Sequence, residues 1–194
     1  MSRRSYVSVL DDVLTPLGFR RTGKRWSRVV GDMLEEIDLQ VSSVAGTTAN
    51  LWTSDLATQE LLREAIPWKR PLGIIQEGQR IGELMCGRDI WWKNEPNGPA
   101  ELAEALRVYA PRYFEGRRRL EDQAKFLGRG TQKWSWTPGR IYLALTLYRM
   151  GEVDEARRAL SNPPKSEVGT WKEQADSVRS WLGCGSGGET RQES

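Results

Sequence analysis

The chain has 194 residues, 38% of them hydrophobic and 28% charged, which is typical of a globular protein rather than a disordered one. It contains no histidine, so the commonest general base and the commonest metal ligand are excluded from its chemistry. No apolar stretch approaches the length of a membrane span, and the two distant cysteines, Cys86 and Cys184, do not make a disulfide framework. We therefore expect a cytoplasmic protein with reduced thiols.

Residues 1–95 have the pattern of an α+β domain with an antiparallel sheet. Apolar residues at i, i+3, i+4 and i+7 predict a helix from Tyr6 to Leu17. Alternation then predicts three strands, over residues 25–30, 33–41 and 48–53. A helix is expected to follow them over residues 56–66. One more strand is expected over 74–84 and a short last strand over 90–92, with a turn at Gly87 and Arg88 between them.

The character of the chain changes after a turn-rich connector at residues 94–99. Helices are predicted over residues 100–109, 114–127, 138–150, 152–160 and 168–182. We expect residues 96–182 to form a helical C-terminal part, either separate from the first domain or within it, and residues 183–194 to be a disordered tail. The predicted fold class is α+β: an antiparallel sheet packed with helices, followed by helices alone.

Five short motifs stand in order: Leu14–Arg21, Trp26–Arg28, Ile37–Ser43, Arg80–Leu84 and Asp89–Trp92, with Asn50 between the third and the fourth. Together they resemble a bacterial family known only as domain of unknown function 4304, over roughly residues 5–127. Val41 departs from the basic or polar residue that this resemblance leads us to expect there. The resemblance implies a curved antiparallel sheet with helices against it, and it implies no reaction.

Residues 141–160 resemble one tetratricopeptide helix pair. Gly151 would lie in the turn, and the small residues Ala144 and Ala156 would let the two helices approach closely. One such unit cannot bury a solenoid core, and the sequence has no second copy. We therefore interpret this segment as a helical hairpin that caps the domain.

An acidic row follows the predicted strand over 33–41. Residues 31–60 contain six acidic and no basic side chains, and alternation places Glu36, Asp38 and Gln40 together on the outer face. Glu35 is a polar exception on the opposite face. Two carboxylates about 7 Å apart on one strand face are able to hold Mg²⁺, which makes a carboxylate- or metal-dependent enzyme one alternative. Because the solvent face of an antiparallel sheet is polar anyway, we predict no metal site and no cofactor.

The adjacent indoles of Trp91 and Trp92 are the second feature that points to binding. Neighbouring strand residues face opposite sides, so one indole should enter the core and the other should lie on the far face. An exposed indole is typical of a protein-binding hot spot. A helix that covered the outer face would instead bury both rings.

A basic segment favours a different partner. Residues 107–140 contain nine basic and three acidic side chains. Nucleic-acid binding through residues 112–136 is therefore an alternative, with phosphates held by charge and bases stacked on an indole. The residues proposed for it are Arg117, Arg118, Arg119, Lys125 and Trp134. Consecutive arginines on a helix point in different directions, which favours a solvated basic face.

These observations assemble no catalytic set. We expect a non-catalytic protein that binds another protein, as an immunity-like or regulatory adaptor does. The residues proposed to contact the partner are Glu36, Asp38, Gln40, Trp91 and Trp92. No membrane partner is expected, and the sequence leaves the oligomeric state open.

Overall fold

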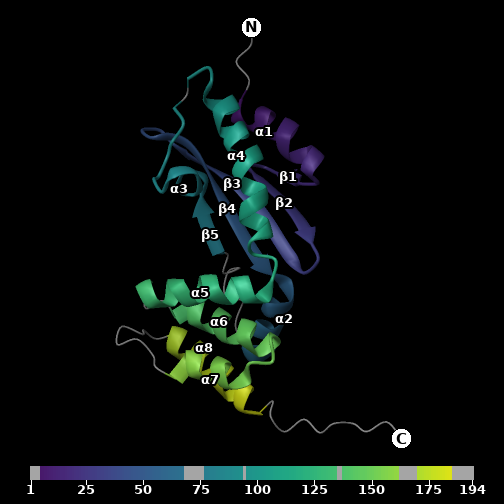
Figure 1. Cartoon of the computed structure of the whole chain (residues 1–194), viewed down its shortest axis with the longest axis vertical. Helices are drawn as coiled ribbons and strands as arrows, with labels where there is room; N and C mark the ends of the chain where they lie inside the picture. The colour runs from purple at the N-terminus through teal and green to yellow at the C-terminus, as the bar shows by residue number, and fades with distance from the viewer. Residues whose placement is uncertain (1–4, 68–76, 94, 135–136, 162–169, 185–194) are drawn as a thin grey trace, which may run out of the picture. The chain divides into compact units, whose positions relative to one another are not determined.

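The computed structural model describes residues 5–67, 77–93, 95–134, 137–161 and 170–184 (Figure 1). The chain forms two compact units. The sheet unit comprises Met1–Leu56 and Gln76–Arg118, and the helical unit comprises Ala57–Ile75 and Arg119–Ser194. The predicted α+β class with a helical C-terminal part is confirmed.

Five antiparallel strands make the sheet, in the spatial order β1-β2-β3-β4-β5. Their bounds are β1 Arg20–Thr22, β2 Arg25–Val30, β3 Met33–Ser42, β4 Gly46–Asp55 and β5 Glu77–Arg80. The first two hairpins turn at Gly23 and Gly31, whose φ angles of 64° and 60° strain any residue with a Cβ. In the centre of the sheet Ile37 stands opposite Trp26 on one side and Leu51 on the other. These three side chains define the inner face.

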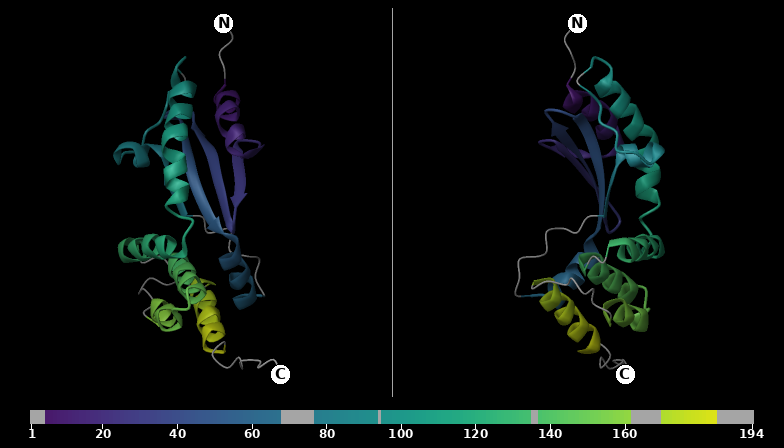
Figure 2. Two further views of the ribbon diagram at one scale, coloured as in Figure 1. Left: turned by 45° about the vertical axis from the view of Figure 1, so that its right-hand side comes forward. Right: turned by 90° about the vertical axis from the view of Figure 1, so that its left-hand side faces the viewer.

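Three helices pack with the inner face: α1 Tyr6–Leu14, α3 Ile81–Cys86 and α4 Gly98–Glu115. Figure 2 shows α1 and α4 on the same side of the strands. The core between them and the sheet contains Leu10, Leu14, Trp26, Ile37, Leu51, Leu102 and Leu106, all with no exposed surface. The Tyr113 hydroxyl donates a hydrogen bond of 3.1 Å to the carbonyl of Leu51, which ties α4 to the middle of β4. The predicted helix over 6–17 ends its α-helical part at Leu14, and a 3₁₀ turn, η1 Thr15–Leu17, completes it.

The prediction of a strand over 74–84 is wrong for its last four residues. Residues 77–80 form β5, residues 81–84 belong to α3, and residues 74–76 lie outside the described residues. Ile81, Leu84 and Met85 have the i, i+3, i+4 spacing of a helix, and all three contact the core. The helix ends where Gly87, with φ of 71°, donates its N–H to the Glu83 carbonyl.

The predicted strand over 90–92 is reduced to a single bridge. Trp92 and Thr47 exchange two backbone hydrogen bonds of 2.8 Å in an antiparallel bridge. Gly46 permits this approach, because a Cβ on Gly46 would lie 2.3 Å from the Trp92 carbonyl oxygen. The bridge fixes the backbone of Trp92 against β4.

The helical unit contains α2 Leu56–Ala65, α5 Leu120–Trp134, α6 Thr137–Arg149, α7 Val153–Ser161 and α8 Thr170–Cys184. The predicted hairpin within 141–160 is confirmed: α6 and α7 join through a turn at Gly151, whose φ is 84°. Ala144 and Ala156 have no exposed surface, in agreement with close helix packing. No helix in the described part of the chain combines the length and the apolar character needed to cross a bilayer.

The boundary drawn from the sequence between residues 95 and 96 differs from the boundary between the two units. The helix α4 contributes Leu102 and Leu106 to the core of the sheet unit. The helix α2 instead contributes Leu62 to the core of the helical unit, although it follows β4 directly. Of the predicted tail over 183–194, residues 183–184 close α8 and the others lie outside the described residues.

Candidate functional site

The side of the sheet opposite α1 and α4 carries a connected set of polar and aromatic side chains, which we call the sheet face. Alternation along β3 puts Glu36, Asp38 and Gln40 there, as predicted. Cross-strand register and the contacts below add residues from β4, from β5 and from the segment after α3. These added residues are Asn50, Trp52, Arg80, Asp89 and Trp91.

Asp38 organises the middle of the sheet face. The Trp52 indole N–H donates to its Oδ1, and the Asn50 amide donates to its Oδ2 at 3.2 Å. The Trp52 ring lies across Gly78 of β5, where a Cβ would fall 2.0 Å from a ring carbon. The indole is therefore fixed at two places: its N–H is bound to the Asp38 carboxylate, and its six-membered ring packs on the backbone of Gly78.

Arg80 links β3 to the segment that follows α3. Its guanidinium donates to the Asp89 carboxylate and, at 3.2 Å, to the Gln40 side-chain oxygen. The Trp91 indole N–H donates to the same Asp89 oxygen at 3.0 Å, and the guanidinium carbon lies 5.2 Å from the centre of the Trp91 ring. Trp91 is thus held against an arginine in a cation–π contact while part of its surface remains exposed.

Glu36 differs from the prediction of a solvent-facing row. Only 5% of its surface is exposed, and its Oε2 has no hydrogen-bond partner among the described residues. Burial raises the pKa of the Glu36 carboxyl; the charge of Arg25, 3.6 Å away, partly opposes this rise and the charge of Asp38 adds to it. The accessible part of the row therefore begins at Asp38.

Trp91 and Trp92 lie on opposite sides of the sheet, as alternation predicts. Trp92 is 7% exposed and belongs to the core of the inner face. Trp91 is only half-buried, so no helix buries both rings. The structure thus brings together four of the five residues proposed for partner binding and places the fifth, Trp92, elsewhere.

Glu35 is the residue whose role the sequence did not reveal. Its carboxylate has no exposed surface and lies between two arginines, with Arg28 Nε 2.7 Å from Oε2 and Arg118 Nε 2.8 Å from Oε1. A charge at an inward strand position requires such partners, because an unpaired buried carboxylate is strongly disfavoured. The sequence did contain a signal for this role, because Glu35 is a charged residue at a position of β3 that alternation places on the apolar inner face. This cluster is structural, since both carboxylate oxygens already accept hydrogen bonds.

The first arginines of the basic segment make contacts within the protein. The guanidinium of Arg117 lies 3.8 Å from the centre of the Tyr113 ring and donates to the Tyr113 carbonyl at 3.1 Å. Arg118 is the partner of Glu35. Both belong to the sheet unit, whereas the other three proposed nucleic-acid-binding residues belong to the helical unit.

Those three residues are Arg119, Lys125 and Trp134. Arg119 lies 3.4 Å from Glu121, and Lys125 lies 3.7 Å from Asp122, so each charge has a carboxylate beside it. The Trp134 side chain lies outside the described residues. The nucleic-acid interface stays a prediction.

The carboxylate and metal alternative also stays a prediction. Within the described ranges, no group of three or more acidic or cysteine side chains is close enough to hold a metal ion. Glu36 and Asp38 contribute two carboxylates, and both oxygens of Asp38 already accept hydrogen bonds.

Comparison of the chain with protein-family models, curated proteins and solved structures gave no match. The resemblance to domain of unknown function 4304 therefore stays a prediction, and the sheet face has to be interpreted from its own geometry.

Proposed function

We propose that this chain is a non-catalytic protein-binding module, of the immunity-like or regulatory-adaptor kind, and that its sheet face contacts the partner. The observation that carries the proposal is a pair of half-buried indoles, Trp52 and Trp91, with Arg80 on the same face. Tryptophan and arginine are the residue types most enriched in the hot spots of protein interfaces.

The hot-spot side chains are already held in place. Each indole N–H donates to a carboxylate, Trp52 to Asp38 and Trp91 to Asp89. Arg80 is fixed by Asp89 as well. Side chains ordered before association lose less conformational entropy when a partner docks, so more of the contact energy contributes to affinity.

The sheet face carries charges of both signs. Its carboxylates are Glu36, Asp38 and Asp89, and the strand register puts the guanidinium groups of Arg20, Arg25 and Arg80 on the same face. A partner whose charges complement this pattern would associate faster, with a smaller effect on final affinity.

The test is affinity capture from a lysate of the cells that make this protein, with and without nuclease treatment. Two variants change the sheet face without removing a buried group: Gln40→Lys adds a positive charge at an exposed position, and Trp91→Ala removes an indole. The control is Glu115→Lys, which adds two units of positive charge, against one for Gln40→Lys, at the exposed C-terminal end of α4.

We expect the wild type and Glu115→Lys to retain one protein after nuclease treatment. Trp91→Ala should weaken this complex by about 30-fold, the effect of losing a hot spot of about 2 kcal/mol. Gln40→Lys should change the association rate mainly at low salt. Equal capture by all four proteins would contradict the proposal. Loss of the captured material on nuclease treatment would favour the nucleic-acid alternative.

A further inference from the structure

Glu36 is a buried titratable group in the middle of the sheet face. Only 5% of its surface is exposed, and its Oε2 accepts no hydrogen bond from any residue that the structure describes. A buried carboxylate oxygen without a donor destabilises the ionised form, because the protein does not replace the hydrogen bonds that water would give. Uptake of a proton relieves this cost, and burial accordingly raises the pKa of the Glu36 carboxyl.

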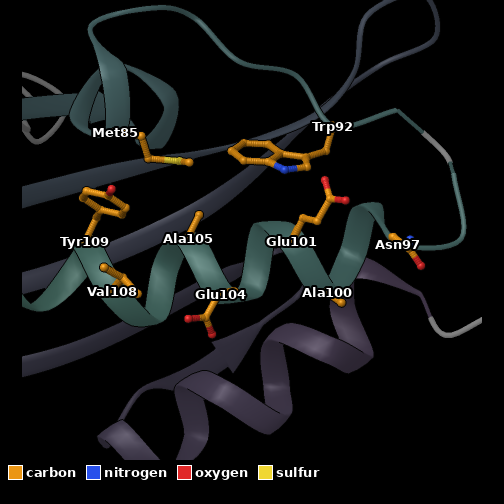
Figure 3. A pocket seen from close by; sticks show the side chains of 9 residues that line it. All are labelled: Met85, Trp92, Asn97, Ala100, Glu101, Glu104, Ala105, Val108 and Tyr109. Carbon is orange, nitrogen blue, oxygen red and sulfur yellow. The ribbon is translucent and has the colours of Figure 1, made fainter.

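Carboxyl groups on the helical side of the sheet unit are solvated instead. Glu101 and Glu104 stand on α4 beside a groove that Trp92 also lines (Figure 3). Both occupy exposed positions, and Glu104 accepts a hydrogen bond of 2.8 Å from Arg107, which lowers the pKa of the Glu104 carboxyl. Burial without a donor therefore distinguishes Glu36 from these two carboxyl groups.

The charged groups next to Glu36 come from β2 and β3. Arg25 Nη1 on β2 lies 3.6 Å from Glu36 Oε1, and Asp38 is the next outward residue along β3. The outward side chains of β4 carry no titratable group; they are Thr48, Asn50, Trp52 and Ser54. A whole strand separates β3 from the remaining charged groups of the sheet face, which are Arg20 on β1 and Arg80 on β5 with its partner Asp89.

Arg25 lies within reach of both carboxylates. The strand register puts it directly opposite Asp38, whereas its guanidinium contacts Glu36, the diagonal neighbour. Side chains directly opposite each other have Cβ atoms about 4.5–5.5 Å apart, and a long side chain also reaches the diagonal position. The contact with Glu36 is loose, because the Arg25 side chain is 55% exposed. Loss of the negative charge on Glu36 would leave Asp38 as the carboxylate nearest to Arg25.

Asp38 in turn fixes the Trp52 indole. Its Oδ1 accepts the indole N–H, and its Oδ2 accepts the Asn50 amide at 3.2 Å. Both donors belong to β4, which lies on the opposite side of β3 from Arg25. An ion pair between Arg25 and Asp38 would draw the carboxylate towards β2 and away from the indole. The position of the Arg25 guanidinium therefore decides how firmly Trp52 is fixed.

We propose that Glu36 is a proton-sensitive switch of the sheet face. With Glu36 ionised, Arg25 stays beside it and Asp38 fixes the Trp52 indole. When Glu36 binds one proton from solvent, Arg25 moves to Asp38 and the hydrogen bond from the indole is lost.

The effect of this switch on partner binding rests on the proposed function, whereas the switch itself belongs to the free protein. An indole that is no longer fixed loses more conformational entropy when a partner docks, so binding should weaken as the pH falls. Because Glu36 is only 5% exposed, a partner removes little further water from it, and the change in the order of Trp52 dominates.

The test is an NMR titration of the full chain without a partner, from about pH 8 to about pH 4. It follows the side-chain carboxyl carbon of Glu36 and the indole N–H signal of Trp52. The indole N–H signals of Trp26 and Trp91 are internal references, because each of these groups donates to a different aspartate.

Three variants separate the steps of the switch. Glu36→Gln keeps the shape of the side chain without its charge, and Arg25→Gln removes the guanidinium that moves. The matched control is Arg20→Gln, which makes the same charge change at an exposed position of the same face.

We expect the Trp52 signal of the wild type to shift with the midpoint of the Glu36 carboxyl, and the Trp26 and Trp91 signals not to shift at that midpoint. Glu36→Gln should lack this shift. Arg25→Gln should raise the midpoint of Glu36, because the charge of Arg25 opposes the rise in its pKa, and the Trp52 signal should no longer follow it. Arg20→Gln should behave like the wild type.

Three outcomes would overturn the switch. The first is a Trp52 signal that does not follow Glu36, and the second is a signal that follows it equally well in Arg25→Gln. The third is a shift of all three indole signals at one midpoint, which would indicate a general change of the fold.

Capture of the partner at about pH 7 and about pH 5 then tests the consequence for binding, and we expect retention to weaken at least about threefold at the lower pH. Equal retention at both pH values would overturn that consequence. A switch seen by NMR together with no captured protein at either pH would contradict the proposed function alone.

Discussion

Replacement of Arg118 by alanine tests whether the buried Glu35 cluster stabilises the sheet unit. Arg118 Nε lies 2.8 Å from a carboxylate that has no exposed surface. A charge-assisted hydrogen bond contributes about 1.5–3 kcal/mol, and its loss leaves one buried oxygen without a donor. Arg118 is itself one-third exposed, so water would replace part of the lost interaction. We therefore expect the free energy of unfolding of the sheet unit to fall by about 2–3 kcal/mol.

The neighbouring Arg119 provides a matched control. Its side chain is 74% exposed and its contact with Glu121 measures 3.4 Å, so Arg119→Ala should cost less than about 1 kcal/mol. Hydrogen exchange of the β2 and β3 amides, measured by mass spectrometry, reports on the sheet unit alone. In a Glu35→Gln background the cost of Arg118→Ala should shrink by at least about 1 kcal/mol, because the two residues interact directly. Equal costs for Arg118→Ala and Arg119→Ala would refute this reasoning.

Three other predictions follow from single contacts. Glu36→Gln should raise the melting temperature at pH 7 and give no gain near pH 4. The pKa of Glu36 is raised in the folded state, so its ionised carboxyl destabilises the fold at high pH. A gain in melting temperature that does not depend on pH would contradict this. Gly78→Ala should displace the Trp52 ring and shift its indole N–H signal in NMR spectra, and an unchanged signal would show that the ring is not held there. Tyr113→Phe should lower the free energy of unfolding by about 1–2 kcal/mol in urea titrations followed by β4 hydrogen exchange, because the Leu51 carbonyl loses a buried donor; no change would indicate that another donor reaches it.

Local patterns in the sequence predicted most elements of the fold. The alternation over 33–41 identified β3, and the turn at Gly151 with small residues on either side identified the α6–α7 hairpin. The strand predicted over 74–84 was wrong for residues 81–84, because the six residues of α3 are too few to separate a helical period from a strand period. The spacing of Ile81, Leu84 and Met85 was the better guide.

The candidate site was predictable only along single strands. Period-two alternation put Asp38 and Gln40 on one face and separated Trp91 from Trp92. Alternation did not predict that Trp52 and Arg80 belong to the site, because their position beside Asp38 and Gln40 depends on cross-strand register. That register is set by long-range pairing rather than by neighbours in the sequence.

Burial was likewise set by tertiary contacts. Alternation correctly put Glu36 and Ile37 on different faces of β3. It did not predict that Glu36 would be almost fully buried, because that depends on the side chains of the neighbouring strands. The division between units also depends on packing, because α4 follows a turn-rich connector and yet completes the core of the sheet unit through Leu102 and Leu106.

Site-specific photo-crosslinking from the sheet face tests the central claim most directly. A photo-reactive amino acid would replace the exposed Gln40 and, in a control protein, the exposed Glu115, in the cells that make this chain. We predict a crosslink from position 40 to one protein, absent from position 115 and lost when Trp91→Ala is added. Crosslinks to nucleic acid, or the same protein crosslinked from both positions and unaffected by Trp91→Ala, would contradict the account.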